Sequence, residues 1–138
     1  MSGLDGTAKD VFVLDDILIP GTKQTPEISC KNKSGEISFK GNFISSNPIE
    51  LIEPIQQWLY SFIKGKPAGI TITFQLTYLN GCSGKSLNKL FQQAEEIQGR
   101  GVNVNVQLFY EDDDIDMFEW CKEIKSTYQL QFSLTKVN

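Results

Sequence analysis

The sequence contains no histidine among its 138 residues. That absence excludes Ser-His-Asp and Cys-His catalytic arrangements, histidine general bases and histidine-containing zinc sites. Catalysis would therefore have to rest on carboxylates, lysine, tyrosine or cysteine. The three cysteines (Cys30, Cys82 and Cys121) are far apart and form no C-x-x-C pair, so we expect reduced thiols in a cytosolic protein.

Long apolar runs and an excess of positive charge are also missing. The apolar runs are far shorter than the roughly 20 residues of a membrane span, and residues 1–10 are polar and Gly-rich, without the apolar core of a signal peptide. We therefore expect a cytoplasmic protein with no membrane span. The formal net charge of −4 argues against a nucleic-acid partner, which requires a basic surface.

The composition is typical of a soluble globular chain, with 40% hydrophobic and 22% charged residues. At this length we expect a single domain over residues 11–138, preceded by a flexible arm over residues 1–10. No internal repeat or linker interrupts the chain.

Alternating apolar and polar residues predict several strands. Residues 69–80 alternate most clearly, and Ser34-Gly35 is typical of the turn of a β-hairpin. Residues 11–19 are apolar but interrupted by two aspartates, which leaves a short strand or an amphipathic turn open. The other predicted strands are 27–33, 36–42, 102–110 and 129–137.

Three stretches with helical spacing of apolar residues lie between these strands. For the first helix, Asn47 is predicted to cap, Pro48 to occupy the first position and Glu50 to complete a capping box. Pro54 implies either a kink or a helix that starts near it. The second helix is predicted over residues 83–98. Residues 111–116 open the third, whose inward-facing residues are expected to be Ile115, Phe118, Cys121 and Ile124.

The order of these elements predicts the fold class. Strands that alternate with helices indicate an α/β domain, here with a mixed sheet of about five to six strands and three helices packed on it. In such sheets, ligands and chemistry concentrate where strands end and helices begin.

The turn from Asn80 to Ser86 is such a junction. Free backbone N–H groups and the positive end of a helix favour an anion there. Ser83 is the candidate phosphate acceptor, and Lys85 is a possible charge partner. The alternative is that Ser83 only caps the helix.

The same turn contains the sequence Gly84-Lys85-Ser86, which resembles the end of a P-loop. A P-loop places its first glycine five positions before the second, whereas Leu79 stands at that position. A nucleotide- or phosphate-binding protein that uses this turn is therefore the alternative function. Cys82, close to the helix N-terminus, is either a reactive thiol or simply a small turn residue.

An acidic run follows the strand 102–110. Carboxylates at Glu111, Asp112, Asp113, Asp114 and Asp116 are suited to magnesium. Acidic residues are also favoured in the first turn of a helix, and we expect one of them to cap the third helix instead.

Several segments together resemble the SiaC-type bacterial regulatory phosphoproteins, a family of STAS-like, anti-sigma-factor-antagonist-like domains. The segment I-P-G-T-K-Q-T-P-E-I (residues 19–28) resembles the opening signature of the family, and Tyr78-Leu79-Asn80 resembles its Y-x-N lead-in to the turn. Residues 35–41, 48–63 and 110–113 fit in order, so that the resemblance covers roughly residues 17–134.

The resemblance implies a non-enzymatic module without a cofactor. In this family a kinase with an ATPase fold phosphorylates the threonine after the asparagine, a PP2C-type phosphatase removes the phosphate, and some members bind a diguanylate cyclase. Here Gly81 replaces that threonine and Cys82 replaces a serine, whereas Asn80, Ser83 and Lys85 are retained. Either Ser83 has become the acceptor, or the protein is permanently dephospho-like.

The resemblance also bears on the loop before the hairpin. It implies that Thr22 and Thr25 belong to a surface beside the phosphorylated turn. Judged from the residues alone, threonines in a Pro-containing loop bond their own backbone, and we expect that structural role.

Overall fold

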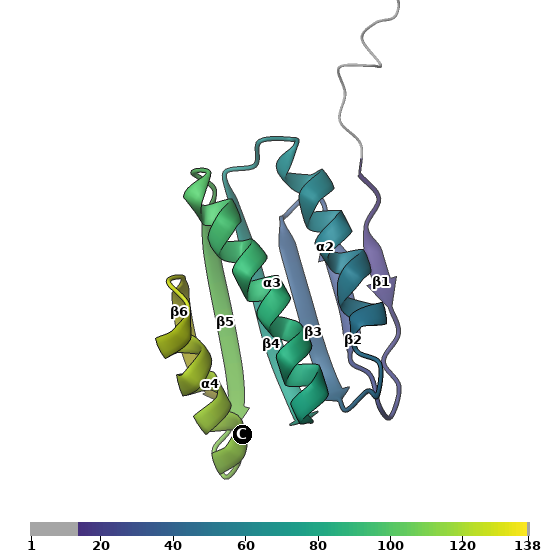
Figure 1. Cartoon of the computed structure of the whole chain (residues 1–138), viewed down its shortest axis with the longest axis vertical. Coiled ribbons are helices and arrows are strands. Elements are labelled where there is room, and N and C mark those ends of the chain that lie inside the picture. The colour runs from purple at the N-terminus through teal and green to yellow at the C-terminus, as the bar shows by residue number, and fades with distance from the viewer. Residues whose placement is uncertain (1–13, 138) are drawn as a thin grey trace, which may run out of the picture.

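The computed structural model describes residues 14–137 and contains a six-stranded mixed sheet within that range (Figure 1). The strands lie in sequence order, with β1 and β2 antiparallel, β2 and β3 antiparallel, and the remaining pairs parallel. The strands are β1 (Ile17–Ile19), β2 (Glu27–Lys31), β3 (Glu36–Phe43), β4 (Gly69–Leu79), β5 (Asn103–Glu111) and β6 (Gln131–Val137).

The three helices cover one face of this sheet. They are α2 (Ile49–Ile63), α3 (Gly81–Gly99) and α4 (Ile115–Thr127), and Figure 1 shows them side by side on the same side of the strands. Parallel strands connected in sequence order by crossovers of one hand place all their helices on one face. The C-terminal ends of β3, β4 and β5 therefore meet at one edge of the sheet.

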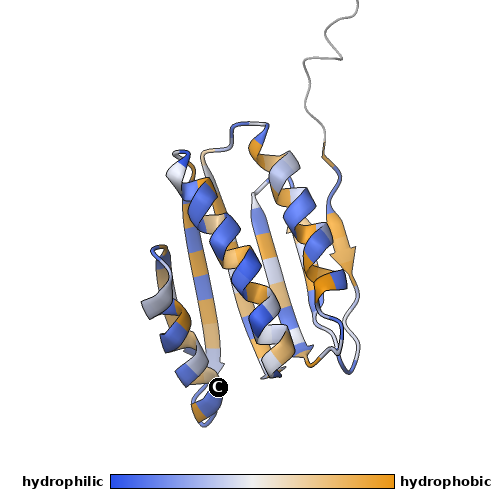
Figure 2. Ribbon diagram, in the orientation of Figure 1, coloured by the Kyte–Doolittle hydropathy of each residue, from blue (hydrophilic) through white to orange (hydrophobic). Residues whose placement is uncertain are grey.

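The two faces of the sheet differ in chemistry. The face under the helices is apolar, and the rings of Phe39 and Phe74 stack there with centroids 4.9 Å apart. The open face is polar and carries a hydrogen bond of 2.8 Å between the hydroxyls of Ser29 and Ser38. Figure 2 shows the corresponding alternation of hydrophilic and hydrophobic residues along β5.

The predicted fold class is confirmed, and most element positions agree with the prediction. The segment 17–19 forms a short strand, whereas residues 1–13, including the expected arm over 1–10, lie outside the described residues. None of the helices in residues 14–137 is long and apolar enough to cross a membrane.

The predicted start of the first helix is wrong. Pro48 occupies the N-cap with helical dihedral angles, no side chain caps the helix, and α2 runs continuously through Pro54. The N–H of Asn47 instead donates to the hydroxyl of Ser45 at 3.1 Å. Since Pro48 already has αR geometry and its carbonyl accepts from Leu51, the helix begins at Ile49 without a side-chain cap.

The predicted inward face of the third helix is partly wrong. Ile115 is 71% exposed, whereas Met117, Cys121 and Ile124 are buried. The buried positions follow the helical period from 117, which places Ile115 on the outer side of the first turn. An apolar residue therefore lies exposed at the edge where the strands end.

Candidate functional site

Asn80 connects three segments at the start of α3. Its Oδ1 accepts from the N–H of Ser83 at 2.9 Å, which makes Asn80 the N-cap. Its Nδ2 donates to the carbonyl of Ser45 at 3.3 Å, and its own N–H donates to the carbonyl of Phe43. The prediction that Ser83 caps the helix is therefore wrong, because the helix begins at Gly81.

Ser83 lies on the inner side of the turn and is completely buried. Its hydroxyl accepts from the N–H of Ser45 at 3.2 Å, and its carbonyl accepts from the hydroxyl of Ser86 at 2.6 Å. A kinase cannot reach this hydroxyl while the turn is closed. The burial therefore counts against Ser83 as a phosphate acceptor.

The outer side of the turn is open to solvent. Gly81, Cys82 and Lys85 are exposed, and a Cβ added at Gly81 would meet no atom within 4 Å. Gly84 is half-buried, and a Cβ there would make ordinary contacts with Leu79 and Trp120 at 3.7–3.8 Å. A side chain at position 81 is thus the one that would point freely into solvent.

The geometry argues against the alternative of a phosphate loop at Gly84-Lys85-Ser86. These residues belong to the first turns of α3, and the N–H of Gly84 already donates to the carbonyl of Asn80 at 2.9 Å. The hydroxyl of Ser86 is buried and donates to a backbone carbonyl. A P-loop requires a free backbone cradle, and this turn does not provide one.

Thr22 and Thr25 stabilise their own loop. The hydroxyl of Thr22 lies 2.7 Å from that of Thr25 and accepts from the N–H groups of Gln24 and Thr25. The loop is bound to the end of β3, since the carbonyl of Gln24 accepts from Ile44. These are the hydrogen bonds expected of turn threonines, and the loop lies next to the segment that contacts Asn80 and Ser83.

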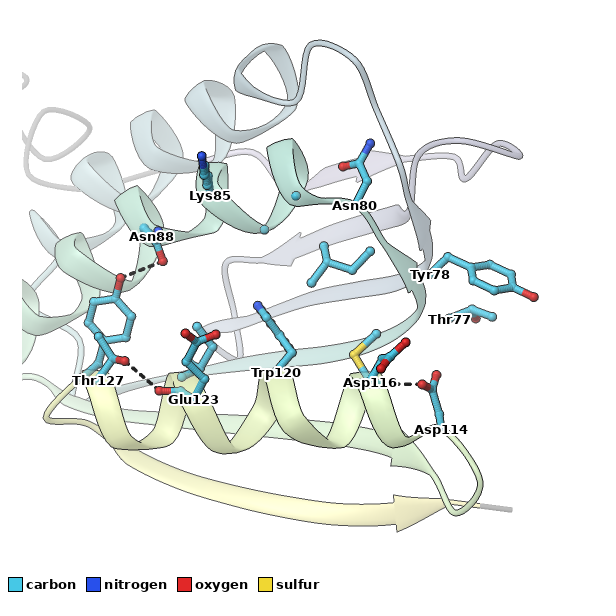
Figure 3. Close-up of a pocket in the computed structure, with 16 residues that line it drawn as sticks. Thr77, Tyr78, Asn80, Lys85, Asn88, Asp114, Asp116, Trp120, Glu123 and Thr127 are labelled. Atoms are coloured by element: carbon cyan, nitrogen blue, oxygen red, sulfur yellow. Dashed lines mark hydrogen bonds between the residues drawn. The ribbon is translucent and has the colours of Figure 1, made fainter.

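A groove separates α3 from α4 beside the turn, with a volume of about 650 Å³ (Figure 3). Trp120 points into it from α4, while Tyr78 projects outward at the end of β4. Its apolar residues are Leu79, Met117, Trp120 and Ile124, and its polar and charged residues include Lys85, Asn88, Asp114, Asp116 and Glu123.

Exposed apolar side chains surround this edge. Tyr78 is 63% exposed and Ile115 is 71% exposed, and Ile44 follows the end of β3 at 37%. Aromatic and large aliphatic residues are enriched at the centre of protein interfaces. The edge therefore has the chemistry of a protein-binding surface.

The acidic run is organised around the start of α4. Asp114 is the N-cap, because its Oδ1 accepts from the N–H of Met117 at 3.0 Å, and Asp112 lies 3.5 Å from the amine of Lys136. Within residues 14–137, no three potential ligands come together around a metal position. The predicted capping role is confirmed for Asp114.

The three thiols lie in different environments. Burial raises the pKa of Cys30 to about 12, and the Asp16 charge adds to this shift. Burial likewise raises the pKa of Cys121 to about 12, with a smaller contribution from Asp114. Only Cys82 is exposed, and all three cysteines are free.

Taken together, helices on one face of a mixed sheet and a capped, partly exposed turn beside a groove define a small α/β domain with a surface suited to binding a protein. The chain belongs to the SiaC family of regulatory phosphoproteins, whose family model matches residues 19–137. A protein of Pseudomonas aeruginosa strain UCBPP-PA14, described as uncharacterized, is 25% identical over 121 residues, which cover 88% of this chain and 96% of that protein.

Solved structures of the family have the same fold. Apo-SiaC from Pseudomonas aeruginosa superposes with a TM-score of 0.81 at 25% identity, over 88% of this chain and 99% of that one. A second structure shows SiaC in complex with the diguanylate cyclase SiaD, of which SiaC is the activator. It superposes with a TM-score of 0.82 at 24% identity, over 88% of this chain and 100% of that one. The overall fold of the chain is therefore that of known SiaC structures.

Sequence reasoning missed two parts of this edge. Ser45, which contacts both Asn80 and Ser83, lies just before the predicted cap Asn47 and carried no signal of its own. The sequence did not indicate the groove residue Trp120, since a single tryptophan in an amphipathic helix is typically part of the hydrophobic core. Only the tertiary arrangement places these residues beside the turn.

Proposed function

We propose that this chain is a non-catalytic regulatory protein that binds a diguanylate cyclase through the surface around the turn 80–85. The proposal is supported by membership of the SiaC family and by the complex of SiaC with SiaD, in which SiaC is named as the activator. The three free thiols and the absence of histidine from the sequence agree with a non-catalytic binding role.

The observation that carries the proposal is the cluster of exposed apolar side chains beside the turn. Tyr78 lines the groove near the end of β4, Ile115 is the first residue of α4, and each leaves more than half of its surface in contact with water. Truncating such central anchors commonly weakens a complex by about 1–2 kcal/mol or more.

This surface is tested with two truncations and a matched control. Tyr78→Ala and Ile115→Ala are expected to weaken binding to the cyclase by roughly tenfold each, measured by isothermal titration. Leu18→Ala is the control, because Leu18 is as exposed as Ile115 but lies on β1 at the far edge of the sheet. Equal effects at all three positions would contradict the proposed surface.

Phosphorylation is the second part of the proposal. The family resemblance implies a kinase with an ATPase fold and a PP2C-type phosphatase as further partners, with the acceptor threonine at the position of Gly81. Gly81 has no hydroxyl, and Ser83 is buried with its hydroxyl occupied by Ser45. We therefore favour a permanently dephospho-like protein that binds its cyclase without phosphate control.

Restoring the threonine tests this view directly. The open space around position 81 accommodates a side chain, so Gly81→Thr is expected to gain one phosphate when it is incubated with ATP and the cognate kinase. Mass spectrometry of the turn should find none in the wild-type protein. The control is Gly99→Thr, at the other end of α3, where the space is equally open. A phosphate on Ser83 of the wild-type protein would support the other hypothesis.

A further inference from the structure

The C-terminal ends of α2 and α3 lie at the edge of the sheet opposite the turn (Figure 1). A second concave site lies there. Its volume is about 600 Å³, within the range of pockets that bind small molecules. Ile63, Ile97 and Val102 line it, and Tyr60 stands at the rim with 44% of its surface exposed. This pocket is independent of the turn and of the function proposed above.

Three cations line the same pocket. Lys64, Lys66 and Arg100 are exposed, and among the described residues none of them has a carboxylate within 4 Å. The pocket has no acidic residue in its lining, although the chain as a whole has a formal net charge of −4. The C-terminal ends of two helices contribute about −1 in total, so three cations leave the pocket with a net positive charge of about +2.

The backbone at Lys66 supports a role for its side chain. Its φ of 53° is the one positive value among the non-glycine residues of the described segment 14–137. Glycine adopts this left-handed conformation without the steric penalty that a Cβ brings. A lysine therefore stands where the backbone favours glycine, and it places a charge at the pocket.

We propose that this pocket binds a small organic anion with a flat apolar body. Tyr60, Ile63 and Val102 contact the apolar body, and the three cations bind a carboxylate, sulfonate or phosphate group. The pocket lies about 28 Å from the turn, the length of the 19 residues of α3. A ligand there can be bound together with a protein at the turn.

A pair of dyes tests the proposal. Anilinonaphthalene sulfonate has an aromatic body and an anionic group, and N-phenylnaphthylamine has the same rings without the charge. Saturable binding of the anionic dye to the folded wild-type protein is expected. Amide chemical-shift changes should map to residues 63–67 and 97–102. Changes confined to the groove between α3 and α4, or no saturable binding, would overturn the proposal.

Removal of the three cations tests whether the pocket recognises the charge of the dye or only its apolar rings. The triple variant Lys64→Gln, Lys66→Gln and Arg100→Gln is expected to bind the anionic dye at least tenfold more weakly and the neutral dye within about twofold of the wild type. The matched control changes the exposed residues Lys33, Lys89 and Lys125 to Gln. An equal loss in the control would show that only net charge matters and would overturn the proposal.

Lys66→Gly gives a further test, because it should raise stability while it weakens dye binding. Because glycine relieves the backbone, the unfolding temperature should rise, which also shows that the variant folds. The affinity for the anionic dye should fall several-fold at the same time. An unchanged affinity would contradict the role assigned to this lysine.

Discussion

The turn at the start of α3 has two sides that differ in burial and in hydrogen bonding. On the inner side, Asn80, Ser83 and Ser86 use their side chains in hydrogen bonds of 2.6–3.3 Å with neighbouring backbone. On the outer side, Gly81 and Cys82 are exposed, and the space around Gly81 is empty. One short segment thus contains both a rigid support and a free surface.

The difference separates two roles that the sequence cannot separate. Hydroxyl and amide groups on the inner side fix the start of the helix to the segment after β3, and substitutions there should act on stability. Residues on the outer side are exposed, and substitutions there should act on partners. Three predictions test this division, and a fourth extends the contrast between buried and exposed groups to the thiols.

The largest effect is expected from Ser83→Asp. The change places a carboxylate at a fully buried position, next to a backbone N–H that can satisfy only part of it. Burial of an unpaired charge should lower the free energy of unfolding by about 3–5 kcal/mol, measured by urea titration. The variant is therefore expected to act as a destabilised protein and not as a mimic of phosphorylation.

Lys85→Asp is the control for this prediction. It introduces the same side chain two residues later, at an exposed position near the N-terminal end of the helix, where an acidic group is favourable. A change in unfolding free energy of less than about 0.5 kcal/mol is expected. Equal stability of the two variants would show that the inner side is open to solvent.

The same contrast shows what the sequence could predict. Alternation in residues 69–80 and helical spacing from Leu87 to Ile97 predicted the core, because burial requires those periods. The turn was also found, since a strand-to-helix junction is a local feature. The burial of Ser83 was not predictable, because it depends on Ser45, 38 residues away in sequence. Likewise Ile115 was misassigned, because a short amphipathic helix leaves its phase ambiguous at the first turn.

The second prediction concerns the thiols. Cys30 and Cys121 have pKa values raised from 9.0 to about 12 in the folded protein, so the folded state resists their ionisation. Below pH 9 each thiol is neutral in both the folded and the unfolded state, and its contribution to stability is fully present. As the pH rises from 9 toward 12, the thiol ionises in the unfolded state first, and this contribution to the free energy of unfolding is lost. Between pH 8 and pH 10 the unfolding free energy should fall by roughly 2–3 kcal/mol, measured in urea at each pH.

Labelling separates the exposed thiol from these two. Iodoacetamide at pH 8 should modify Cys82 quickly and leave the two buried cysteines unmodified until the protein unfolds. Cys121→Ala should reduce the loss of stability at high pH by about half, whereas Cys82→Ser should leave it unchanged. Rapid labelling of all three thiols in the native protein would contradict the structure.

The third prediction concerns the N-cap. Asn80→Ala removes the acceptor of the Ser83 N–H and the donor to the Ser45 carbonyl. Loss of a capping side chain typically lowers stability by about 1 kcal/mol, and this is the expected fall in unfolding free energy. Asn80→Asp, which keeps the acceptor, should recover part of the loss. If both variants matched the wild type, the inner side of the turn would not support the helix.

The smallest effect is expected on the outer side, at Gly81. Gly81 does not have a positive φ, and a Cβ there would meet no atom within 4 Å. Gly81→Ala should therefore stabilise the protein by about 0.5 kcal/mol, because alanine lowers the conformational entropy of the unfolded chain. Gly35→Ala is the opposite case, because φ is 69° and the new Cβ would lie 2.8 Å from the carbonyl oxygen of Gly69; it should be clearly destabilising. Thermal unfolding of both variants measures the contrast. A destabilised Gly81→Ala would mean that the outer side also supports the fold, and partner effects at position 81 could then no longer be separated from folding.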